Sequence, residues 1–365
     1  MGIFNYNYLG VNNLTADILS TIKNAKRYVK VCAFLMHEKE VKDLLIKRAG
    51  NISVFILSNR QSDEVFDFYE EGPEEIKIQT SNLLDLELAG AHVKFINGLH
   101  AKFVIADGES GWITSANMNS NSLHANIETG VRLEGQNLAE LESVFDHLFC
   151  NADGHLDIMK ETLAFNSNVC PLDNSFVQCF SGRLRITLSY NLPENDSSVP
   201  VGVLRNCKVT TLYNEILRII NNATSKLTIV TWHFNLFSKY KMKEGTQKEG
   251  SDKLEGFINA VKSARDRGVE IDTFSDPIGY EGSTRRSLIS EEYLRDQLGC
   301  RIYHVRKNHS KCVVNEREGL MLTGNIDCMR SMEHGFEVGY LLDNQQLDLQ
   351  RGLILRMLRE AEAYL

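Results

Sequence analysis

The chain has 365 residues, a formal net charge of −8, 43% hydrophobic residues and 24% charged residues. These values are typical of a soluble globular protein, and they argue against disorder and against a protein that coats nucleic acid through bulk positive charge. One hydrophobic core rarely grows to this size, so two domains are expected. There is no run of eighteen apolar residues and no signal-peptide or myristoylation pattern at the start, so neither export nor membrane anchoring is expected.

The eight cysteines are irregularly spaced and form no Cys-x-x-Cys pair. Cys32, Cys312 and Cys328 fall inside apolar, strand-like or motif segments. This pattern indicates reduced thiols in the core and argues against a disulfide framework or a zinc site. We therefore expect a cytoplasmic protein without a metal or other cofactor.

Helical and strand patterns alternate along both halves of the chain. In the first half the patterns predict a helix at 14–27, a strand at 28–35, a helix at 40–49, a strand at 51–58 and an amphipathic stretch at 138–149. The second half repeats this order with a helix at 212–223, a strand at 227–234, a helix at 252–267, a strand at 269–274, a helix at 289–298, a strand at 301–305 and an amphipathic stretch at 347–365. Such alternation indicates βαβ units, that is, an α/β fold with mixed, mostly parallel sheets flanked by helices.

The segment between the two halves matches neither of them and carries loop signals such as the run 191–198. We interpret residues 151–210 as a connector that contains one strand at 183–190. The predicted domains are thus a first lobe at 1–150 and a second lobe at 211–365, related by an internal duplication.

Each half also carries one copy of a longer motif. His100-x-Lys102-x4-Asp107 in the first half recurs as His309-x-Lys311-x4-Glu316 in the second. Both copies continue in the same way, first with a hydroxyl-x-Asn pair and then with a glutamate at the same distance from the histidine: Ser115, Asn117 and Glu128 in one half, Thr323, Asn325 and Glu337 in the other. One short motif would be weak on its own, but two copies with matching followers are strong.

These paired motifs resemble those of the phospholipase D superfamily. The resemblance implies two similar lobes packed face to face as a pseudo-dimer, each contributing one motif to a single site at the seam. The chain departs from the usual pattern at Glu316, where the family mostly has Asp, and at Thr114 and Leu322, where it mostly has Gly. These departures concern local turns and salt links, because the motif carboxylate in this family mostly supports structure.

The motif residues suit a two-step displacement at a phosphodiester. One neutral histidine attacks phosphorus, the other protonates the leaving oxygen, and water then cleaves the phosphohistidine. Lys102, Lys311, Asn117 and Asn325 would hold the non-bridging oxygens without a metal. Glu128 and Glu337 would each orient a histidine, as the third member of a triad does. The resemblance makes His100 the nucleophile and His309 the acid, with Asp107, Ser115, Glu316 and Thr323 in support.

The substrate depends on the surroundings of the site. We expect a nuclease, because the second half carries basic residues and a histidine at the end of a predicted strand, which could guide a polyanion: His233, Lys239, Lys241, Lys243, Arg306 and Lys307. The expected partner is nucleic acid as the substrate, without stable membrane insertion, and partner proteins of a larger system stay open. The alternatives are a phospholipid hydrolase or phosphatidyl transferase, and a catalytically silent nucleic-acid-binding protein.

Overall fold

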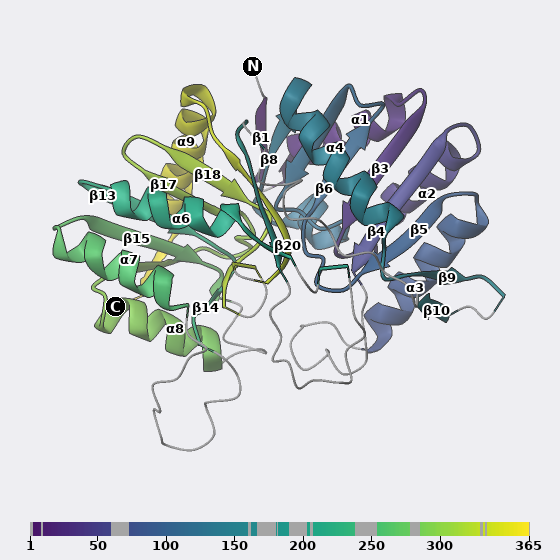
Figure 1. Ribbon diagram of the computed structural model, residues 1–365. Coiled ribbons are helices and arrows are strands. Elements are labelled where there is room, and N and C mark those ends of the chain that lie inside the picture. The colour runs from purple at the N-terminus through teal and green to yellow at the C-terminus, as the bar shows by residue number, and fades with distance from the viewer. Residues whose placement is uncertain are drawn as a thin grey trace.

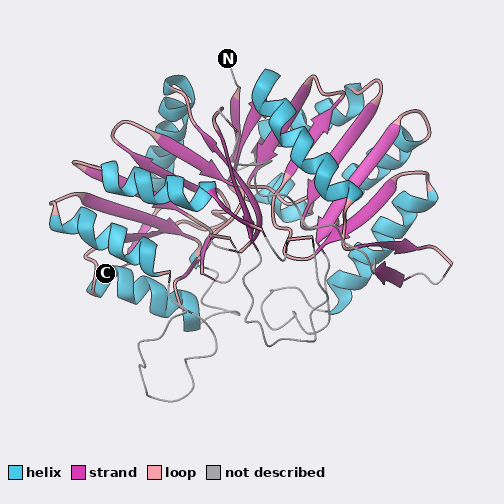
Figure 2. Cartoon of the chain, viewed as in Figure 1, coloured by secondary structure: helices cyan, strands magenta, loops and turns pink. Residues whose placement is uncertain are grey.

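The computed structural model describes residues 3–8, 10–59, 73–159, 162–165, 180, 182–189, 203–204, 207–237, 254–277, 285–328, 331–332 and 334–364. In this part of the chain two α/β lobes lie side by side, and their strands fan out from a central seam near β20 (Figure 1). Helices cover the outer faces of both sheets (Figure 2). The predicted α/β fold with two similar lobes is confirmed.

The first lobe is built on a ten-stranded sheet with the order β10-β9-β5-β4-β3-β6-β7-β8-β1-β2. These strands are β1 (Phe4–Tyr8), β2 (Val11–Asn12), β3 (Tyr28–Ala33), β4 (Ser53–Asn59), β5 (His92–Ile96), β6 (Phe103–Ala106), β7 (Ser110–Thr114), β8 (Glu128–Leu133), β9 (Gly154–Asp157) and β10 (Thr162–Phe165). The helices of this lobe are α1 (Asn13–Asn24), α2 (Lys39–Ala49), α3 (Pro73–Leu88), the π-helix η2 (Asn121–Ala125) and α4 (Gly135–Cys150).

The second lobe has a nine-stranded sheet with the order β12-β11-β20-β18-β17-β13-β15-β16-β21 and a small pair, β14 with β19. The strands are β11 (Leu184–Ser189), β12 (Lys208–Thr210), β13 (Lys226–Val230), β14 (Phe234–Asn235), β15 (Glu270–Ser275), β16 (Arg301–His304), β17 (Cys312–Asn315), β18 (Gly319–Leu322), β19 (Ile326–Asp327), β20 (Gly335–Leu341) and β21 (Glu362–Tyr364). Its helices are α6 (Thr211–Asn222), α7 (Glu255–Asp266), α8 (Arg285–Asp296) and α9 (Asn344–Glu360).

The sheets are mixed as predicted, but they are not mostly parallel. In the first sheet only β3–β4 and β4–β5 pair in parallel among the described strands, and in the second only β13–β15 and β15–β16 do. The predicted alternation of helix and strand includes β3, β4, β13, β15 and β16 of these parallel pairs, whereas α3 and β5 of the first lobe were not predicted. Each motif strand instead runs antiparallel to the first parallel strand and continues into a meander, β6–β7–β8 or β17–β18–β20.

The segment predicted to be a connector extends both sheets. Strands β9 and β10 add to the edge of the first sheet beyond β5, and β11 and β12 add to the second beyond β20. The expected strand at 183–190 is confirmed as β11. The amphipathic stretch predicted at 347–365 also differs, since α9 ends at Glu360 and the strand β21 follows it and pairs with β16.

The two lobes share one hydrophobic core across the seam. The ring of Phe103 lies 6.1 Å from the ring of Phe145 in its own lobe and 6.1 Å from the ring of Phe336 in the other, both in edge-to-face contact. All three side chains are buried. Burial of this kind stabilises by about 1.5–3 kcal/mol for each large side chain, so the lobes are held together as firmly as the layers of one domain.

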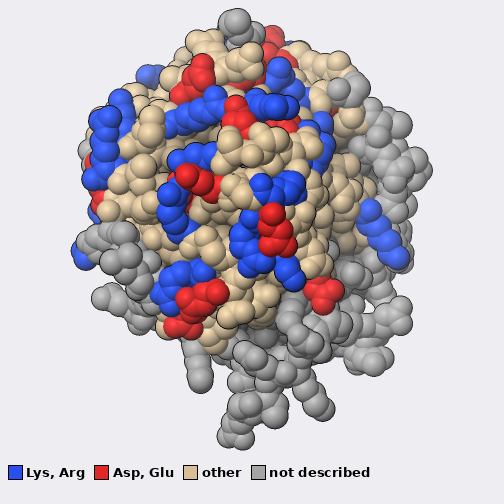
Figure 3. Space-filling model, turned by 90° about the vertical axis from the view of Figure 1, so that its left-hand side faces the viewer, with Lys and Arg blue, Asp and Glu red and all other residues tan. Residues whose placement is uncertain are grey.

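The outer face of the second lobe mixes both signs of charge (Figure 3). Several cations of the second lobe are paired with acidic side chains, for example Arg218 with Glu318 and Arg265 with Asp266. Since neutralised pairs of this kind attract a polyanion weakly, a binding surface for nucleic acid is not expected on this face.

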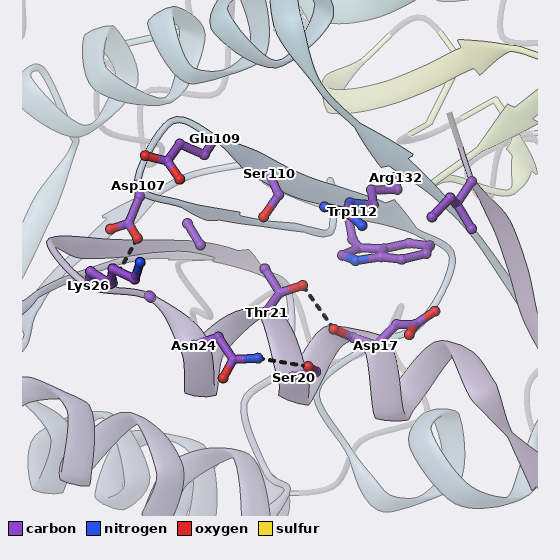
Figure 4. Close-up of a pocket in the computed structure, with 13 residues that line it drawn as sticks. Asp17, Ser20, Thr21, Asn24, Lys26, Asp107, Glu109, Ser110, Trp112 and Arg132 are labelled. Carbon is purple, nitrogen blue, oxygen red and sulfur yellow. Dashed lines mark hydrogen bonds between the residues drawn. The ribbon is translucent and has the colours of Figure 1, made fainter. Parts of the chain in front are cut away.

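The motif carboxylates tie each motif strand to the turn before the first parallel strand. The carboxylate of Asp107, at the far end of β6 from Lys102, accepts hydrogen bonds from the backbone N–H groups of Lys26, Arg27 and Tyr28 at 2.7–2.9 Å. Figure 4 shows this carboxylate at the end of a hollow of about 330 Å³ beside α1. In the second lobe Glu316 accepts from the N–H and hydroxyl of Thr224. Both residues lie outside the histidine site.

We predict that Asp107→Ala lowers the free energy of unfolding by about 1–3 kcal/mol, because it leaves three backbone donors without their acceptor. Burial raises the pKa of Asp107, but the three N–H groups lower it further, so the net shift is downward. The stabilisation is therefore complete above the pKa of an aspartate in the unfolded chain, about 4. It is lost as the pH falls through the pKa of Asp107 in the folded protein, which is lower. Urea unfolding at neutral pH and in acid measures both effects.

Asp43→Ala is the matched control, because Asp43 is exposed and has no hydrogen bond or ion pair with the described residues. Its cost should stay within about 0.5 kcal/mol. Equal costs for the two variants would contradict the assignment of Asp107 as the tie between β6 and the start of β3.

Candidate active site

Two reciprocal backbone contacts join the lobes at the motif histidines. On one side His100 N–H and Ala101 N–H donate to the carbonyl of Phe336, at 3.1 and 2.8 Å. On the other side His309 N–H donates to the carbonyl of Ile127 at 3.0 Å, and Ile127 N–H donates to the carbonyl of Lys307 at 2.7 Å. In both contacts, the residue just before the motif glutamate of one lobe is hydrogen-bonded through its backbone to the segment that carries the motif histidine of the other lobe.

As a result of this pairing, each motif histidine faces the motif glutamate of the other lobe. Nδ1 of His100 lies 2.5 Å from Oε1 of Glu337, and Nδ1 of His309 lies 2.7 Å from Oε1 of Glu128. Each glutamate is fully buried. Since Nδ1 of each ring faces a carboxylate, Nε2 is the nitrogen left for a substrate.

The second oxygen of each glutamate is held from within its own lobe. The hydroxyl of Ser115 donates to Oε2 of Glu128, and the hydroxyl of Thr323 donates to Oε2 of Glu337 at 2.6 Å. Each carboxylate therefore joins a hydroxyl of its own lobe to the histidine of the other. The hydroxyl-x-Asn element predicted from the sequence contributes to the site through this bond.

The two motif lysines are fully buried beside the histidines. Nζ of Lys102 donates to the carbonyl of His100 at 2.5 Å and to that of Thr323 at 3.3 Å, and Nζ of Lys311 donates to the carbonyl of His309 at 2.7 Å. Burial lowers the pKa of Lys102 to about 8 and that of Lys311 to about 7, although the buried glutamates raise both. Both lysines thus lose their protons much more readily than a lysine in water does.

The histidines are almost enclosed, with side-chain exposures of 15% for His100 and 10% for His309. Burial lowers the pKa of both imidazoles, to about 4 for His309, even though the facing glutamate raises each of them. At neutral pH both rings are therefore neutral in the empty site. A bound phosphate anion would favour protonation of one of them.

The motif asparagines complete the set. Asn117 and Asn325 are buried, and Oδ1 of Asn117 has no hydrogen-bond partner among the described residues. Oδ1 of Asn325 accepts a long hydrogen bond from the hydroxyl of Thr231, at 3.4 Å. An unpaired buried carbonyl oxygen is costly, and because it is an acceptor, only the Nδ2 group of each amide can donate to a phosphate oxygen.

An aromatic residue stands beside each histidine, and the sequence analysis missed both. The ring of Phe34 lies 5.0 Å from that of His100, and the ring of Trp232 lies 5.5 Å from that of His309, each at a steep angle. Phe34 follows β3 and Trp232 follows β13, so the two residues occupy equivalent places in the lobes. The duplication itself is the signal that could have identified them.

The residues predicted to bind substrate are only partly described. His233 follows Trp232 and lies 3.6 Å from Asp327, and Arg306 and Lys307 are exposed just before His309. The predicted contacts at Lys239, Lys241 and Lys243 lie outside the described residues. In the described ranges no group of three or more His, Cys, Asp or Glu side chains is placed to hold a metal ion.

The comparisons with known proteins agree with this geometry. Residues 18–149, which hold the whole first motif, match the sequence model of the PLD-like domain of cardiolipin synthase. The second lobe repeats the same set of His, Lys, hydroxyl, Asn and Glu in the same sheet positions. The first lobe therefore contains a phospholipase D-like domain, and the second lobe repeats its motif and its strand order. A search of curated proteins by sequence finds no match.

Two solved structures extend the likeness over both lobes. Phosphatidylserine synthase from Haemophilus influenzae Rd KW20 is 14% identical, with a TM-score of 0.63, over 99% of this chain and 87% of its own. Polyphosphate kinase from Porphyromonas gingivalis is 11% identical, with a TM-score of 0.54, over 97% of this chain and 49% of its own, so the present chain spans about half the length of that kinase. At these identities the likeness concerns the two-lobed fold alone.

The crossed pairs generate a prediction about the glutamates. Glu337→Gln and Glu128→Gln should each lower turnover by on the order of 10² to 10⁴, because an amide facing Nδ1 no longer fixes the tautomer and charge of the histidine in the other lobe. Turnover of the purified, folded variants tests this. The double variant His100→Ala, Glu337→Gln should be no slower than His100→Ala alone, because the two residues act as a unit.

Glu109→Gln serves as the control, since Glu109 belongs to the same lobe as Glu128 and is exposed in the turn before β7. It should keep wild-type turnover. If the two buried glutamates can be replaced with effects no larger than that of Glu109, the crossed pairs have no part in turnover.

The lysine environment predicts how anion binding depends on pH. Binding of inorganic phosphate should weaken as the pH rises through about 7 to 8, because Lys311 and then Lys102 lose their protons in this range. Calorimetric titration with phosphate at several pH values measures the effect. Lys311→Arg should extend tight binding to higher pH, since a guanidinium stays charged. Affinity that does not change across this range would contradict the assignment of the lysines.

Proposed function

We propose that the chain is a metal-independent phosphodiesterase that hydrolyses nucleic acid through a phosphohistidine intermediate. The phospholipase D-like domain of the first lobe supports action on a phosphodiester bond. The observation that carries the mechanism is the crossed arrangement of His100 with Glu337 and His309 with Glu128, which leaves two Nε2 atoms for one phosphate.

In the first step Nε2 of neutral His100 attacks phosphorus and a phosphorus–nitrogen bond forms. The bond from phosphorus to the leaving oxygen breaks, and His309, which takes up a proton when the anionic substrate binds, gives that proton to the leaving oxygen. In the second step His309 removes a proton from water as the water oxygen attacks phosphorus. His100 then leaves as neutral imidazole, and the histidines return to their starting states. We assign the nucleophile to His100 by resemblance to the superfamily.

The remaining motif residues act on charge and orientation. Lys102 and Lys311 would turn their ammonium groups from the histidine carbonyls to the non-bridging oxygens, and Asn117 and Asn325 would offer amide donors there. Donors fixed in a buried site stabilise the developing charge more strongly than donors in water. The chemistry can therefore run without a metal ion.

The surroundings of the site favour a nucleic acid over a lipid. Among the described residues the large exposed apolar side chains all lie outside the two motif segments in the sequence: Ile3, Val11, Ile78, Leu88, Ile158, Met159, Leu349 and Leu355. The segment before His309 instead exposes the cations Arg306 and Lys307. Exposed cations beside a buried phosphate site suit a substrate that carries several phosphates. No helix in the described ranges is long and apolar enough to cross a membrane.

A second candidate is phospholipid hydrolysis or phosphatidyl transfer. It is favoured by the likeness to phosphatidylserine synthase over 99% of the chain. In that reaction an alcohol would take the place of water in the second step. A silent binding protein is the least favoured candidate, because both His/Lys pairs and both glutamates are intact and in contact.

Free thiols support a cytoplasmic location. Among the described residues, Cys32, Cys300 and Cys312 are buried free thiols and Cys150 is an exposed one. Reduced thiols persist most easily in a reducing compartment.

The proposal predicts cleavage of labelled single-stranded DNA or RNA in excess chelator, with single strands preferred over duplex because a flexible backbone reaches an enclosed site more easily. His100→Ala and His309→Ala should each lower turnover by on the order of 10³ or more. Cleavage assays on DNA, RNA and phospholipid vesicles test this directly. Hydrolysis of the vesicles with all nucleic acids left intact would establish the second candidate instead.

His92→Ala is the control for the histidine variants, because His92 lies exposed at the start of β5. Its turnover should equal that of the wild type. Activity that disappears in chelator and returns with a divalent ion would refute the metal-free mechanism.

A further inference from the structure

We propose that the second lobe carries a nucleotide subsite beside His309, in which a base stacks on Trp232 and a neighbouring phosphate binds Lys307. This inference rests on the nucleic-acid function proposed above and deepens it.

The indole of Trp232 is available for stacking. Its ring meets His309 at 62° and His233 at 64°, so neither imidazole lies flat on it. No other ring among the described residues contacts it, and the residue is only half-buried. A base stacked on this indole would lie next to the ring of His309 and hence next to the reacting phosphate.

The equivalent place in the first lobe offers no such surface. Phe34 is 3% exposed, and the residue after it, Leu35, is also 3% exposed. In the second lobe the same two places hold Trp232 and His233, both half-buried. The duplicated site is therefore asymmetric, and its accessible aromatic wall is on the second lobe.

The backbone around Trp232 is rigidly held. The carbonyl of Trp232 accepts a hydrogen bond from the N–H of Asp276 at 2.9 Å, and the carbonyl of Thr231 accepts one from the side chain of Asn308 at 2.9 Å. The second bond also brings the segment of Lys307 next to that of Trp232. An aromatic residue on a fixed backbone binds a base with little loss of conformational entropy.

Lys307 occupies a backbone conformation that disfavours its own side chain. Its φ is 63°, in the left-handed region, and the equivalent residue of the first lobe is Gly98 with φ 79°. Glycine takes this conformation without strain, whereas a side chain such as that of lysine does not. A lysine at the position where the duplicate has glycine indicates that the side chain itself has a role.

That role fits a contact with phosphate. Lys307 is exposed, and its ammonium group has no acidic partner among the described residues, as is also true of Arg306. The carbonyl of Lys307 is bound to Ile127 across the seam, so its backbone is fixed two residues before His309. A free cation at this place can meet the phosphate next to the one being cleaved.

Comparison of an oligothymidylate with an abasic oligomer of equal length and charge tests the stacking contact. In the His100→Ala background, which prevents turnover, the abasic oligomer should bind about 5- to 150-fold more weakly. Trp232→Ala should remove this difference, and Trp232→Phe should restore most of it. Equal affinities for the two oligomers in the protein that retains Trp232 would overturn the stacking proposal.

Intrinsic fluorescence gives an independent measurement, because Trp112 and Trp232 are the only tryptophans. Trp112 is 2% exposed in the core of the first lobe, and Trp112→Phe leaves Trp232 as the single reporter. Stacking predicts that the oligothymidylate quenches this emission and the abasic oligomer does not. Equal quenching by both would again overturn the proposal.

Lys307→Gly separates the binding role from a structural one. The melting temperature should stay unchanged or rise by about 1–4 °C, because the strain at φ 63° is relieved. The affinity for oligothymidylate should fall. A plot of log affinity against log salt concentration should also become less steep, by about the amount expected for the loss of one phosphate contact. Lys307→Met, which keeps the strain, should weaken binding without raising the melting temperature.

If Lys307→Gly leaves the affinity for oligothymidylate unchanged, or lowers the melting temperature, the role of Lys307 is structural and this part of the proposal is overturned. The cleavage assay on the wild-type protein distinguishes failure of the subsite from failure of the proposed function. If the protein cleaves nucleic acid but its affinity is unchanged by these substitutions, only the subsite is disproved. If it cleaves only phospholipid, the proposed function is disproved.

Discussion

The site depends on two hydrogen bonds that cross between the lobes, from His100 to Glu337 and from His309 to Glu128. The backbone pairing at the seam aligns them, and the shared core around Phe103 and Phe336 keeps the lobes in register. Breaking either bond leaves a buried carboxylate without its partner, which is strongly unfavourable in a medium of low polarity. The same contacts thus hold the lobes together and orient the reacting groups.

Burial gives the site its unusual protonation. Because burial removes water from around them, the lysines and histidines bind protons more weakly than in water, although the two buried glutamates oppose this shift. The empty site is therefore close to neutral and receives positive charge as an anion enters. A site of this kind distinguishes phosphate esters from neutral molecules without a permanent excess of charge.

Much of this arrangement could be predicted from the sequence, because the duplication shows which residues must converge. Most of the helices and parallel strands follow from their apolar spacing, although α3 and β5 were not predicted, and the lobes follow from the repeat. The prediction that the strands pair mostly in parallel was wrong, because β6 and β17 are too short for their sequence pattern to reveal whether they pair in parallel or antiparallel. The crossing of Glu128 and Glu337 between the lobes was also hidden, because sequence spacing is identical whether a glutamate serves its own lobe or the other. Trp232 was overlooked because an aromatic residue after an apolar strand usually belongs to the core.

The crossed histidine–glutamate pairs also mean that the site cannot be complete before both lobes have been synthesised. The first lobe leaves the ribosome before the second, and domains generally fold in that order. Until β20 has formed against it, His100 has no carboxylate at its Nδ1 atom, and a folded first lobe on its own lacks both the second histidine and the orienting group. A nascent chain therefore holds only half of the crossed arrangement until its C-terminal half has folded against the first lobe.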